Sequence, residues 1–262
     1  MVKLILQYIK NSINIYTFFI FFVKMIVVVK MRMLRLLLVI LMVFMVSACG
    51  KESDAIRFKK EYESLNGKTL KGSSNKVKSL SISKTNPIKY ASYDEVIDVI
   101  KKGTGIIYLG YPECPWCRSA LPVLLEAAGD YKIDTIYYIN MHDERDYYEV
   151  KDGKLVYKKD DKGNEINGTK GYFKLLKALD SELEEYIVTD DDGKEYDTGE
   201  KRIYVPLIVF VHEGKIVGTH LSTVDTQESG YDELTLEEYD ELNGIYANYI
   251  KELVNNYCDE AC

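Results

Sequence analysis

Two cysteines with two residues between them, Cys114 and Cys117, have the spacing in this chain that is best suited to chemistry. At the start of a helix such a pair can close a small disulfide, and the free backbone amides and positive helix end favour a thiolate on the first sulfur. The pKa of Cys114 should therefore fall below the value of about 8.5 of a free cysteine, and Arg118 adds a nearby positive charge. We expect Cys114 to be the exposed sulfur that exchanges with a substrate, and the deeper Cys117 to resolve the mixed disulfide.

The two residues between the cysteines are expected to support the site. Pro115 suits the first turn of a helix, where its missing N–H would have had no partner in any case. Trp116 is expected to form part of the active-site surface, to pack against residues 141–200, or to do both.

The Cys-x-x-Cys pattern also occurs in zinc sites and in structural disulfides, so other interpretations stay open. A structural zinc site usually needs four ligands, and the other close pair, Cys258 and Cys262, has a spacing that we do not recognise as a zinc pattern. A structural disulfide has little reason to lie between a buried strand and a helix start. We therefore expect a redox pair that uses no metal and no organic cofactor.

Cys258 and Cys262 form a second close pair at the chain end. They would lie at positions i and i+4 if the last helix continued, and the terminal position suggests flexibility. This pair could form its own disulfide, accept electrons from Cys114 and Cys117, or staple the end of the chain.

A β-α-β unit is expected to position the first pair. Thr104–Gly110 is typical of a short buried strand, Cys114–Ala128 of a helix, and Ile133–Asn140 of the next strand. Strands joined in this way pair in parallel with a right-handed crossover. The cysteines therefore lie where the first strand has ended and the helix begins.

Further elements are expected on both sides of this unit. Ser92–Glu95 is a capping box that starts a helix, and Gly103 ends that helix. Ile203–Val211 and Lys215–Thr219 predict an antiparallel hairpin, and Leu234–Asn255 predicts a terminal helix.

The segment 141–202 gives weaker and mixed signals. Val150–Lys158 is typical of a hairpin or surface loop, Tyr172–Tyr186 has helical spacing, and Asp191–Gly193 predicts a turn. We expect this segment to be an addition to the core rather than part of it.

The N-terminus is typical of a targeting signal. Residues 36–46 form an uncharged apolar run, with Arg32 and Arg35 before it and small residues after it. Eleven residues span only about 16 Å as a helix, short of a bilayer core of about 30 Å. Residues 46–49 (VSAC) resemble the lipobox of bacterial lipoproteins, which implies that Cys49 carries lipid and anchors the chain.

A transmembrane anchor is the alternative to a lipid anchor. A second apolar stretch, Tyr16–Val29, precedes the run at 36–46 and is interrupted by Lys24. Residues 1–30 need not be native, because Met31 gives a well-proportioned signal by itself.

The composition describes an acidic, globular chain. Its 47% hydrophobic and 29% charged residues exclude a disordered or collagen-like protein. Residues 1–48, the expected signal, hold six basic residues and no acid, so residues 49–262 hold 28 basic and 41 acidic residues, a net charge of −13. A segment with this negative charge binds polyanions poorly, and no nucleic acid is expected as a partner. We expect residues 49–89 to be a flexible tether with a short helix at Ala55–Leu65, residues 90–257 to be the folded domain, and residues 258–262 to be a tail.

A proline opens a strong strand at Val205-Pro206, and proline, which cannot donate within a ladder, must lie at a strand end or edge. At this point the sequence resembles the thioredoxin-like superfamily. The resemblance rests on features in this chain order: the strand Ile106–Leu109, the motif Cys114–Cys117, Pro122, the strand Ile133–Asn140, Val205-Pro206, the hairpin Leu207–Val217 with Gly214, and a closing helix.

The resemblance implies an α/β, thioredoxin-like fold, a central mixed sheet flanked by helices, with an insertion at about 141–200 between the second core strand and the proline strand. It also implies that Val205–Pro206 is a cis peptide facing the Cys114 sulfur, where the Val205 backbone could pair with an extended substrate chain. With the lipobox, residues 111–118 look like those of extracytoplasmic thioredoxin-like lipoproteins of Gram-positive bacteria. The bacteriocin transport accessory proteins have similar motifs.

Two departures from thioredoxins leave the redox direction open. Thioredoxins place a buried Asp six residues before the first cysteine, where this chain has Tyr108. The dipeptide between the cysteines is Pro-Trp, neither the Gly-Pro of thioredoxins nor the Pro-His of strong oxidases. The oxidising compartment and the valine before Pro206 favour oxidation or general exchange.

The sequence therefore predicts a membrane-tethered, extracytoplasmic thiol–disulfide oxidoreductase. Its expected partners are thiols and disulfides of exported proteins, the cell membrane through lipid on Cys49, and an unidentified redox partner. Two alternatives stay open. One is a thioredoxin-like lipoprotein that holds extended exported chains without essential redox turnover, and the other is a metal-binding lipoprotein that uses both cysteine pairs.

Overall fold

The computed structural model describes residues 24–25, 30–33, 35 and 52–255. Cys49, the apolar run 36–46, and the pair Cys258 and Cys262 lie outside the described residues, so what was expected of them stays a prediction. Residues 53–255 belong to one compact unit, which is the folded domain considered below. Within the described residues, no helix is both long and apolar enough to span a bilayer.

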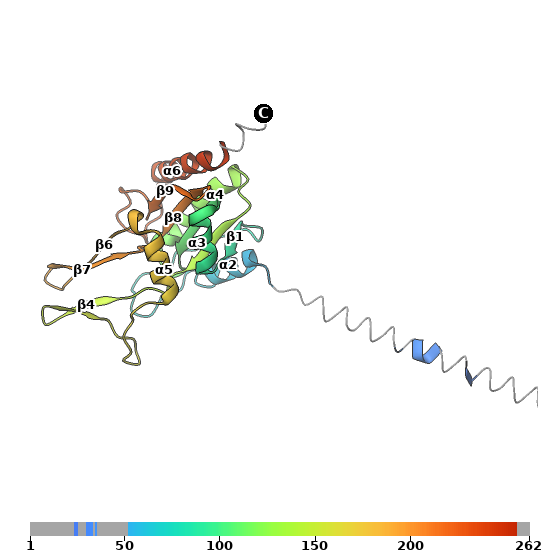
Figure 1. The fold of residues 1–262 in the computed structure, drawn as a ribbon, viewed down its shortest axis with the longest axis horizontal. Helices are drawn as coiled ribbons and strands as arrows, with labels where there is room; N and C mark the ends of the chain where they lie inside the picture. The colour runs from blue at the N-terminus through green and yellow to red at the C-terminus, as the bar shows by residue number, and fades with distance from the viewer. Residues whose placement is uncertain (1–23, 26–29, 34, 36–51, 256–262) are drawn as a thin grey trace, which may run out of the picture. The chain divides into compact units, whose positions relative to one another are not determined.

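A five-stranded mixed sheet forms the centre of the domain (Figure 1). The sheet order is β1-β3-β2-β8-β9, made of β1 (Ile88–Tyr90), β3 (Ile136–Asn140), β2 (Gly105–Gly110), β8 (Leu207–His212) and β9 (Lys215–Leu221). β1 and β2 both pair with β3 in parallel, whereas β8 pairs antiparallel with β2 and with β9. The predicted α/β class, the parallel β-α-β unit and the antiparallel hairpin are therefore confirmed.

Helices cover both faces of the sheet (Figure 1). The first face carries α2 (Asp54–Glu63), α4 (Pro115–Asp130) and α6 (Leu236–Asn255), and the second carries α3 (Tyr93–Lys102) and α5 (Lys170–Ala178). In β2, Ile106 and Tyr108 pack on the first face and Ile107 and Leu109 on the second, and none of the four is exposed. A strand buried on both faces needs an unbroken apolar run, which β2 has.

Local signals place the ends of α3 as expected. The Ser92 side chain accepts a hydrogen bond from the Glu95 N–H, and the Glu95 carboxylate accepts one from the Ser92 N–H at 2.8 Å. At the other end, the Gly103 N–H donates to Val99 O at 2.9 Å. The predicted capping box and the predicted helix end are both confirmed.

The prediction of a flexible tether over residues 49–89 is wrong for residues 53–89. Phe58 and Tyr62 lie one turn apart on α2, and both are completely buried. The Phe58 ring meets the Tyr138 ring edge-on, with centroids 4.9 Å apart. Two aromatic side chains at helical spacing anchor the segment, although the residues around them are mostly polar.

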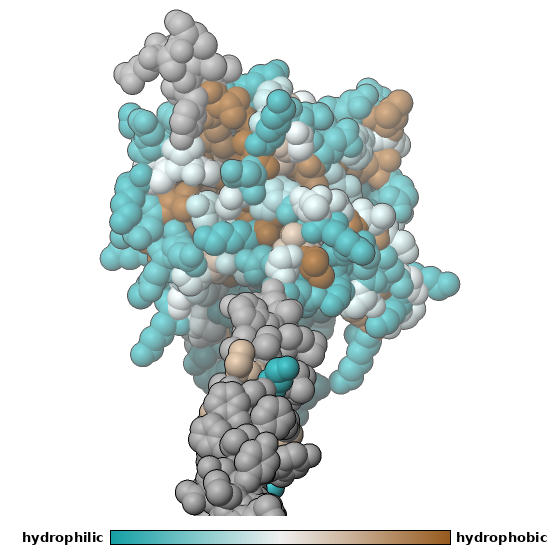
Figure 2. Space-filling view, turned by 90° about the vertical axis from the view of Figure 1, so that its right-hand side faces the viewer, coloured by the Kyte–Doolittle hydropathy of each residue, from teal (hydrophilic) through white to brown (hydrophobic). Residues whose placement is uncertain are grey.

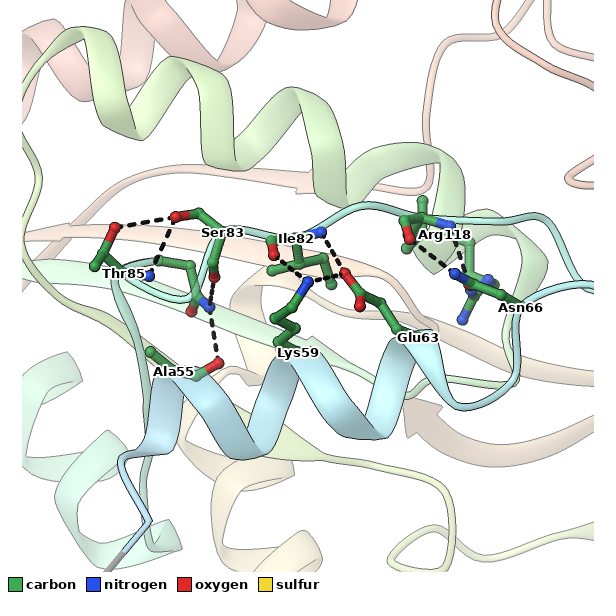
Figure 3. Close-up of polar contacts among 10 residues, drawn as sticks. Ala55, Lys59, Glu63, Asn66, Ile82, Ser83, Thr85 and Arg118 are labelled. Atoms are coloured by element: carbon green, nitrogen blue, oxygen red, sulfur yellow. Dashed lines mark hydrogen bonds and ion pairs between the residues drawn. The ribbon is translucent and has the colours of Figure 1, made fainter.

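Polar contacts join α2 to the chain that returns along it (Figure 3). The Lys59 ammonium donates to Ile82 O at 2.7 Å, and the Ile82 N–H donates to the Glu63 carboxylate at 2.7 Å. The Asn86 side-chain amide donates to Ala55 O at 2.9 Å. These bonds hold residues 80–87 against the helix, so the segment is part of the domain.

The segment between β3 and β8, which was expected to be an insertion and keeps that name below, contains two hairpins and a helix. β4 (Tyr148–Lys151) pairs with β5 (Lys154–Tyr157), and β6 (Glu184–Thr189) pairs with β7 (Glu195–Arg202). The hairpin prediction for 150–158 and the turn prediction at 191–193 are confirmed.

The predicted helix over Tyr172–Tyr186 is too long. α5 ends at Ala178, a short 3₁₀ turn follows at Asp180–Glu182, and β6 begins at Glu184. Leu179 and Leu183 have helical spacing, but the run of Ile187, Val188 and Thr189 favours a strand paired with β7.

The surface of the domain is largely polar. Figure 2 shows one face that is mostly hydrophilic, with hydrophobic residues in small, scattered patches. Among residues 53–255, the exposed large hydrophobic residues are Val156, Phe173, Ile187, Tyr231 and Leu236.

Candidate functional site

Cys114 occupies the N-cap of α4. Its backbone is extended, with φ −71° and ψ 119°, and its sulfur accepts the Cys117 N–H at 3.3 Å. Pro115 follows in the first turn, where no backbone donor is needed. The sulfur therefore takes the place of the side-chain oxygen that usually caps a helix, at the positive end of the helix dipole.

Both thiols are free, and both are buried, with exposed fractions of 4% for Cys114 and 0% for Cys117. The prediction that Cys114 is an exposed sulfur is therefore wrong, although Cys114 remains the less buried of the two. Val205 lies against its sulfur, and the loop 222–235 covers the two residues that follow it.

The two thiols have opposite pKa shifts. The pKa of Cys114 is lowered, first by a hydrogen bond from the Cys117 thiol, then by the Cys117 and Trp116 amides and by the positive charge of Arg145, against the opposing effect of burial. The pKa of Cys117 is raised well above its usual value by burial and by its interaction with Cys114. Cys114 is therefore the thiol that ionises first.

Val205 and Pro206 lie beside Cys114, as the resemblance implied. The Val205–Pro206 peptide is cis. The Cys114 thiol donates to Val205 O at 3.7 Å, a contact that joins residues 91 positions apart. The sheet makes this possible, because β8 starts directly after Pro206 and pairs with β2, the strand that leads to the cysteines.

Arg118 does not supply the positive charge expected at Cys114. Arg118 is 1% exposed, and its guanidinium bonds to the N-terminal segment instead, donating to Tyr62 O and Lys78 O at 3.0 and 2.7 Å. It donates to Asn66 Oδ1 at 2.6 Å (Figure 3). It also donates to Pro112 O at 3.0 Å. The spacing was misleading, because Cys114 is an extended N-cap residue and the guanidinium of Arg118 is held by its bonds to Tyr62 and Lys78.

Arg145, from the insertion, supplies a positive charge that lowers the pKa of Cys114, a smaller effect than that of the hydrogen bonds to its sulfur. Its guanidinium donates to the Tyr147 hydroxyl at 2.9 Å and to the Tyr111 hydroxyl and Ile203 O at 3.4 Å each. No motif marks this arginine, and the sequence analysis missed it. Only the tertiary fold brings the start of the insertion to the cysteines.

Tyr108 occupies the position of the missing buried acid. Its hydroxyl lies 2.9 Å from the Tyr62 hydroxyl, and burial raises the pKa of both tyrosines well above the usual value. The Tyr108 hydroxyl lowers the pKa of Cys117, a smaller effect than that of burial. A neutral hydroxyl pair thus stands beneath Cys117, where it can donate a hydrogen bond to a thiolate.

Trp116 lies against the loop 222–235 at Gly230. A side-chain carbon at Gly230 would lie 2.9 Å from the Trp116 nitrogen, 3.0 Å from its ring and 3.1 Å from Pro115 Cβ. The loop backbone therefore rests directly on the dipeptide between the cysteines, and only glycine leaves room for it.

Substitution of Gly230 by alanine should lift this loop from the site. The added methyl group must displace backbone and ring atoms, which we expect to cost about 1–3 kcal/mol of folding free energy and to make Cys114 alkylation by iodoacetamide faster. Gly244→Ala is the matched control, because no atom lies within 4 Å of its added carbon on α6. An alkylation rate equal to that of the parent protein would contradict the covering role of the loop.

The described part of the chain contains no group of three or more His, Cys, Asp and Glu side chains that could hold a metal ion. Cys258 and Cys262, the second pair of the metal-binding alternative, lie outside it. Comparison of the sequence with family models and with curated proteins finds no match.

Proposed function

We propose that this chain is a thioredoxin-like thiol–disulfide oxidoreductase that exchanges disulfides through Cys114 and Cys117. The observation that carries the proposal is the arrangement of the two thiols at the N-terminus of α4, with opposite pKa shifts and with Cys114 against the Val205 carbonyl. The five-stranded mixed sheet and the cis Val205–Pro206 peptide support it.

The reducing direction begins at the Cys114 thiolate. It attacks a substrate disulfide, so that a bond forms between Cys114 and one substrate sulfur while the substrate S–S bond breaks. The second substrate sulfur leaves with the electron pair and takes up a proton. The Cys117 thiol then loses its proton and attacks the Cys114 sulfur, which releases the first substrate sulfur as a thiol.

Two electrons pass from the cysteines to the substrate in this direction, with one proton from the Cys117 thiol and one from the solvent that took the proton of Cys114. The oxidising direction is the same sequence in reverse, starting from a Cys114–Cys117 disulfide and a substrate dithiol. The reduction potential of the pair decides which direction dominates, and we place oxidation or general exchange first because of the extracytoplasmic setting.

The proposed substrates are exported proteins, and the proposed anchor is lipid on Cys49. Both follow from the signal-like run at 36–46 and the lipobox, together with the acidic domain that follows them. An extended substrate chain would present its cysteine to Cys114 along the Val205 backbone.

Burial of Cys114 favours a second candidate function. Cys114 is 4% exposed, so its thiol meets a substrate sulfur only if the residues around it or the substrate adapt. A thioredoxin-like binding protein, which holds extended chains without turnover, would not need that access.

The proposed function is tested by equilibrating the protein with mixtures of reduced and oxidised glutathione. We expect one reversible, two-electron disulfide between Cys114 and Cys117, identified by mass spectrometry of the alkylated peptides. A potential near about −120 mV would indicate an oxidant and one near about −270 mV a reductant. In Cys117→Ser the mixed disulfide with glutathione should accumulate on Cys114. Failure to form either disulfide would overturn the proposal.

A further inference from the structure

Arg145 is a buried cation that the resemblance to thioredoxin-like proteins does not account for. It lies in the insertion, five residues after β3 ends, and its exposed fraction is 5%. Its guanidinium lies near two aromatic rings, with 5.3 Å to the centroid of Tyr111 and 5.5 Å to that of Tyr147. Burial of a guanidinium raises the free energy of the folded state unless negative charge lies nearby, so a buried arginine of this kind suggests a function.

The contacts of Arg145 join two chain segments that both touch Cys114. Tyr111, whose hydroxyl accepts from Arg145, also accepts the Cys114 N–H on its backbone carbonyl at 3.3 Å. Ile203, whose carbonyl accepts from Arg145, lies two residues before Val205, the residue in contact with the sulfur. One guanidinium therefore joins the chain segment that leads into Cys114 and the segment that faces it.

The adjacent carboxylate does not neutralise Arg145. Asp146 is 2% exposed and pairs with Arg202, whose guanidinium donates to Asp146 Oδ1 at 3.3 Å and to Asp146 O at 2.6 Å. Within the described residues, no ion pair joins Arg145 to a carboxylate, and its buried Nε has no hydrogen-bond partner. Its hydrogen bonds go to neutral oxygens, so its positive charge is available to the site.

We propose that Arg145 is a positioning residue of the thiol pair: its buried guanidinium, supplied by the insertion, stabilises negative charge on the Cys114 sulfur. The inference rests on the proposed function, since it concerns the reactive form of the same sulfur. It gives the insertion a role in the chemistry, because removal of Arg145 should change the reactivity of Cys114.

The thiol and phenol groups that interact with Cys114 stay neutral near pH 7, and the adjacent carboxyl is that of Glu113. Cys117, Tyr108 and Tyr111 interact with Cys114, and burial raises the pKa of each, that of Tyr111 to about 12. The charged or titratable groups that face Arg145 are Tyr111, Tyr147, Tyr172 and Asp146. Burial also raises the pKa of Tyr172. A titration between pH 5 and 9 should therefore report Cys114, since opposite charge favours its ionised form.

The test is the pH dependence of Cys114 alkylation by iodoacetamide in the whole chain, followed by mass spectrometry of the modified peptide. In Arg145→Gln we expect the midpoint to move to higher pH and the rate at pH 7 to fall about fivefold. Arg145→Lys, which keeps the charge, should restore most of the rate. Lys158→Gln removes one positive charge from an exposed residue of the insertion and should leave the midpoint unchanged.

Three results would overturn the inference. They are an unchanged midpoint in folded Arg145→Gln, an equal shift in Lys158→Gln, and no recovery in Arg145→Lys. Circular dichroism at each pH establishes that the variants are folded. If Arg145→Gln does not fold, Arg145→Met, whose unbranched chain replaces the stem of arginine, takes its place in the same comparison.

Alkylation requires no substrate protein and no turnover, so the two proposals can fail separately. If the parent protein forms no reversible disulfide with glutathione but the midpoint still rises in Arg145→Gln, the proposed function fails and the electrostatic role stands. If the parent protein cycles normally and the midpoint does not move, only the role of Arg145 fails.

Discussion

Replacement of Cys114 by serine is expected to reduce disulfide exchange to the uncatalysed rate, a loss of at least about 10³-fold, on the scale seen when an enzyme loses its nucleophile. The effect should be chemical rather than structural. Serine is among the best N-cap residues, and its oxygen can accept the Cys117 N–H that the Cys114 sulfur accepts now. The thermal unfolding midpoint of Cys114→Ser should therefore be no lower than that of the parent protein.

The measurement is the exchange rate with a fluorescent peptide disulfide, with Cys117→Ser as the matched control. Cys117→Ser keeps the attacking sulfur and removes the resolving one, so it should still react once and then stop as a mixed disulfide. Exchange in Cys114→Ser at the parental rate would show that the pair is not the reactive centre. Biological function that survives in Cys114→Ser would instead favour the binding protein without redox turnover.

Substitution of Arg118 by methionine is expected to lower the free energy of unfolding by about 3–5 kcal/mol. The guanidinium is 1% exposed and donates to three backbone carbonyls and to Asn66. Methionine fills part of the same space, but it leaves these acceptors without a donor, and each buried acceptor left unpaired costs about 1–3 kcal/mol before relaxation.

Urea unfolding at pH 7 measures this loss, and Arg57→Met is the control. Arg57 lies on α2 with its side chain 54% exposed and pairs with Glu61 at 3.0 Å, so its loss should cost about 1 kcal/mol or less. Equal destabilisation in the two variants would contradict the conclusion that Arg118 holds the N-terminal segment against α4. A selective loss in Arg118→Met should be accompanied by faster proteolysis within residues 53–82, because this segment depends on the bond to α4.

The sheet and its connections could be predicted because their signals are local. The apolar run of β2, the capping box at Ser92 and Glu95, and the turn before β9 each specify an element within a few residues. The cysteine pair could be placed at the start of α4 for the same reason, since Cys114 and Pro115 together form a helix start.

The roles that the sequence analysis missed depend on contacts between distant residues. The packing of Phe58 and Tyr62 requires Tyr108 and Tyr138 to be on the same face of the sheet. Arg118 was expected near Cys114, whereas Arg145 lies there in the structure. The position of each guanidinium depends on the distant chain segment to which it is hydrogen-bonded. Neither hydrophobic periodicity nor spacing between cysteines carries this information, because the partners lie tens of residues away.

Trp116 is the one tryptophan of the chain, and it lies between the two cysteines. All indole fluorescence of the protein therefore originates at the thiol pair. Formation of a disulfide beside an indole quenches its emission, and movement of the Gly230 loop changes the polarity around the ring. The protein thus contains its own optical reporter, which can follow oxidation and loop opening in real time without a label.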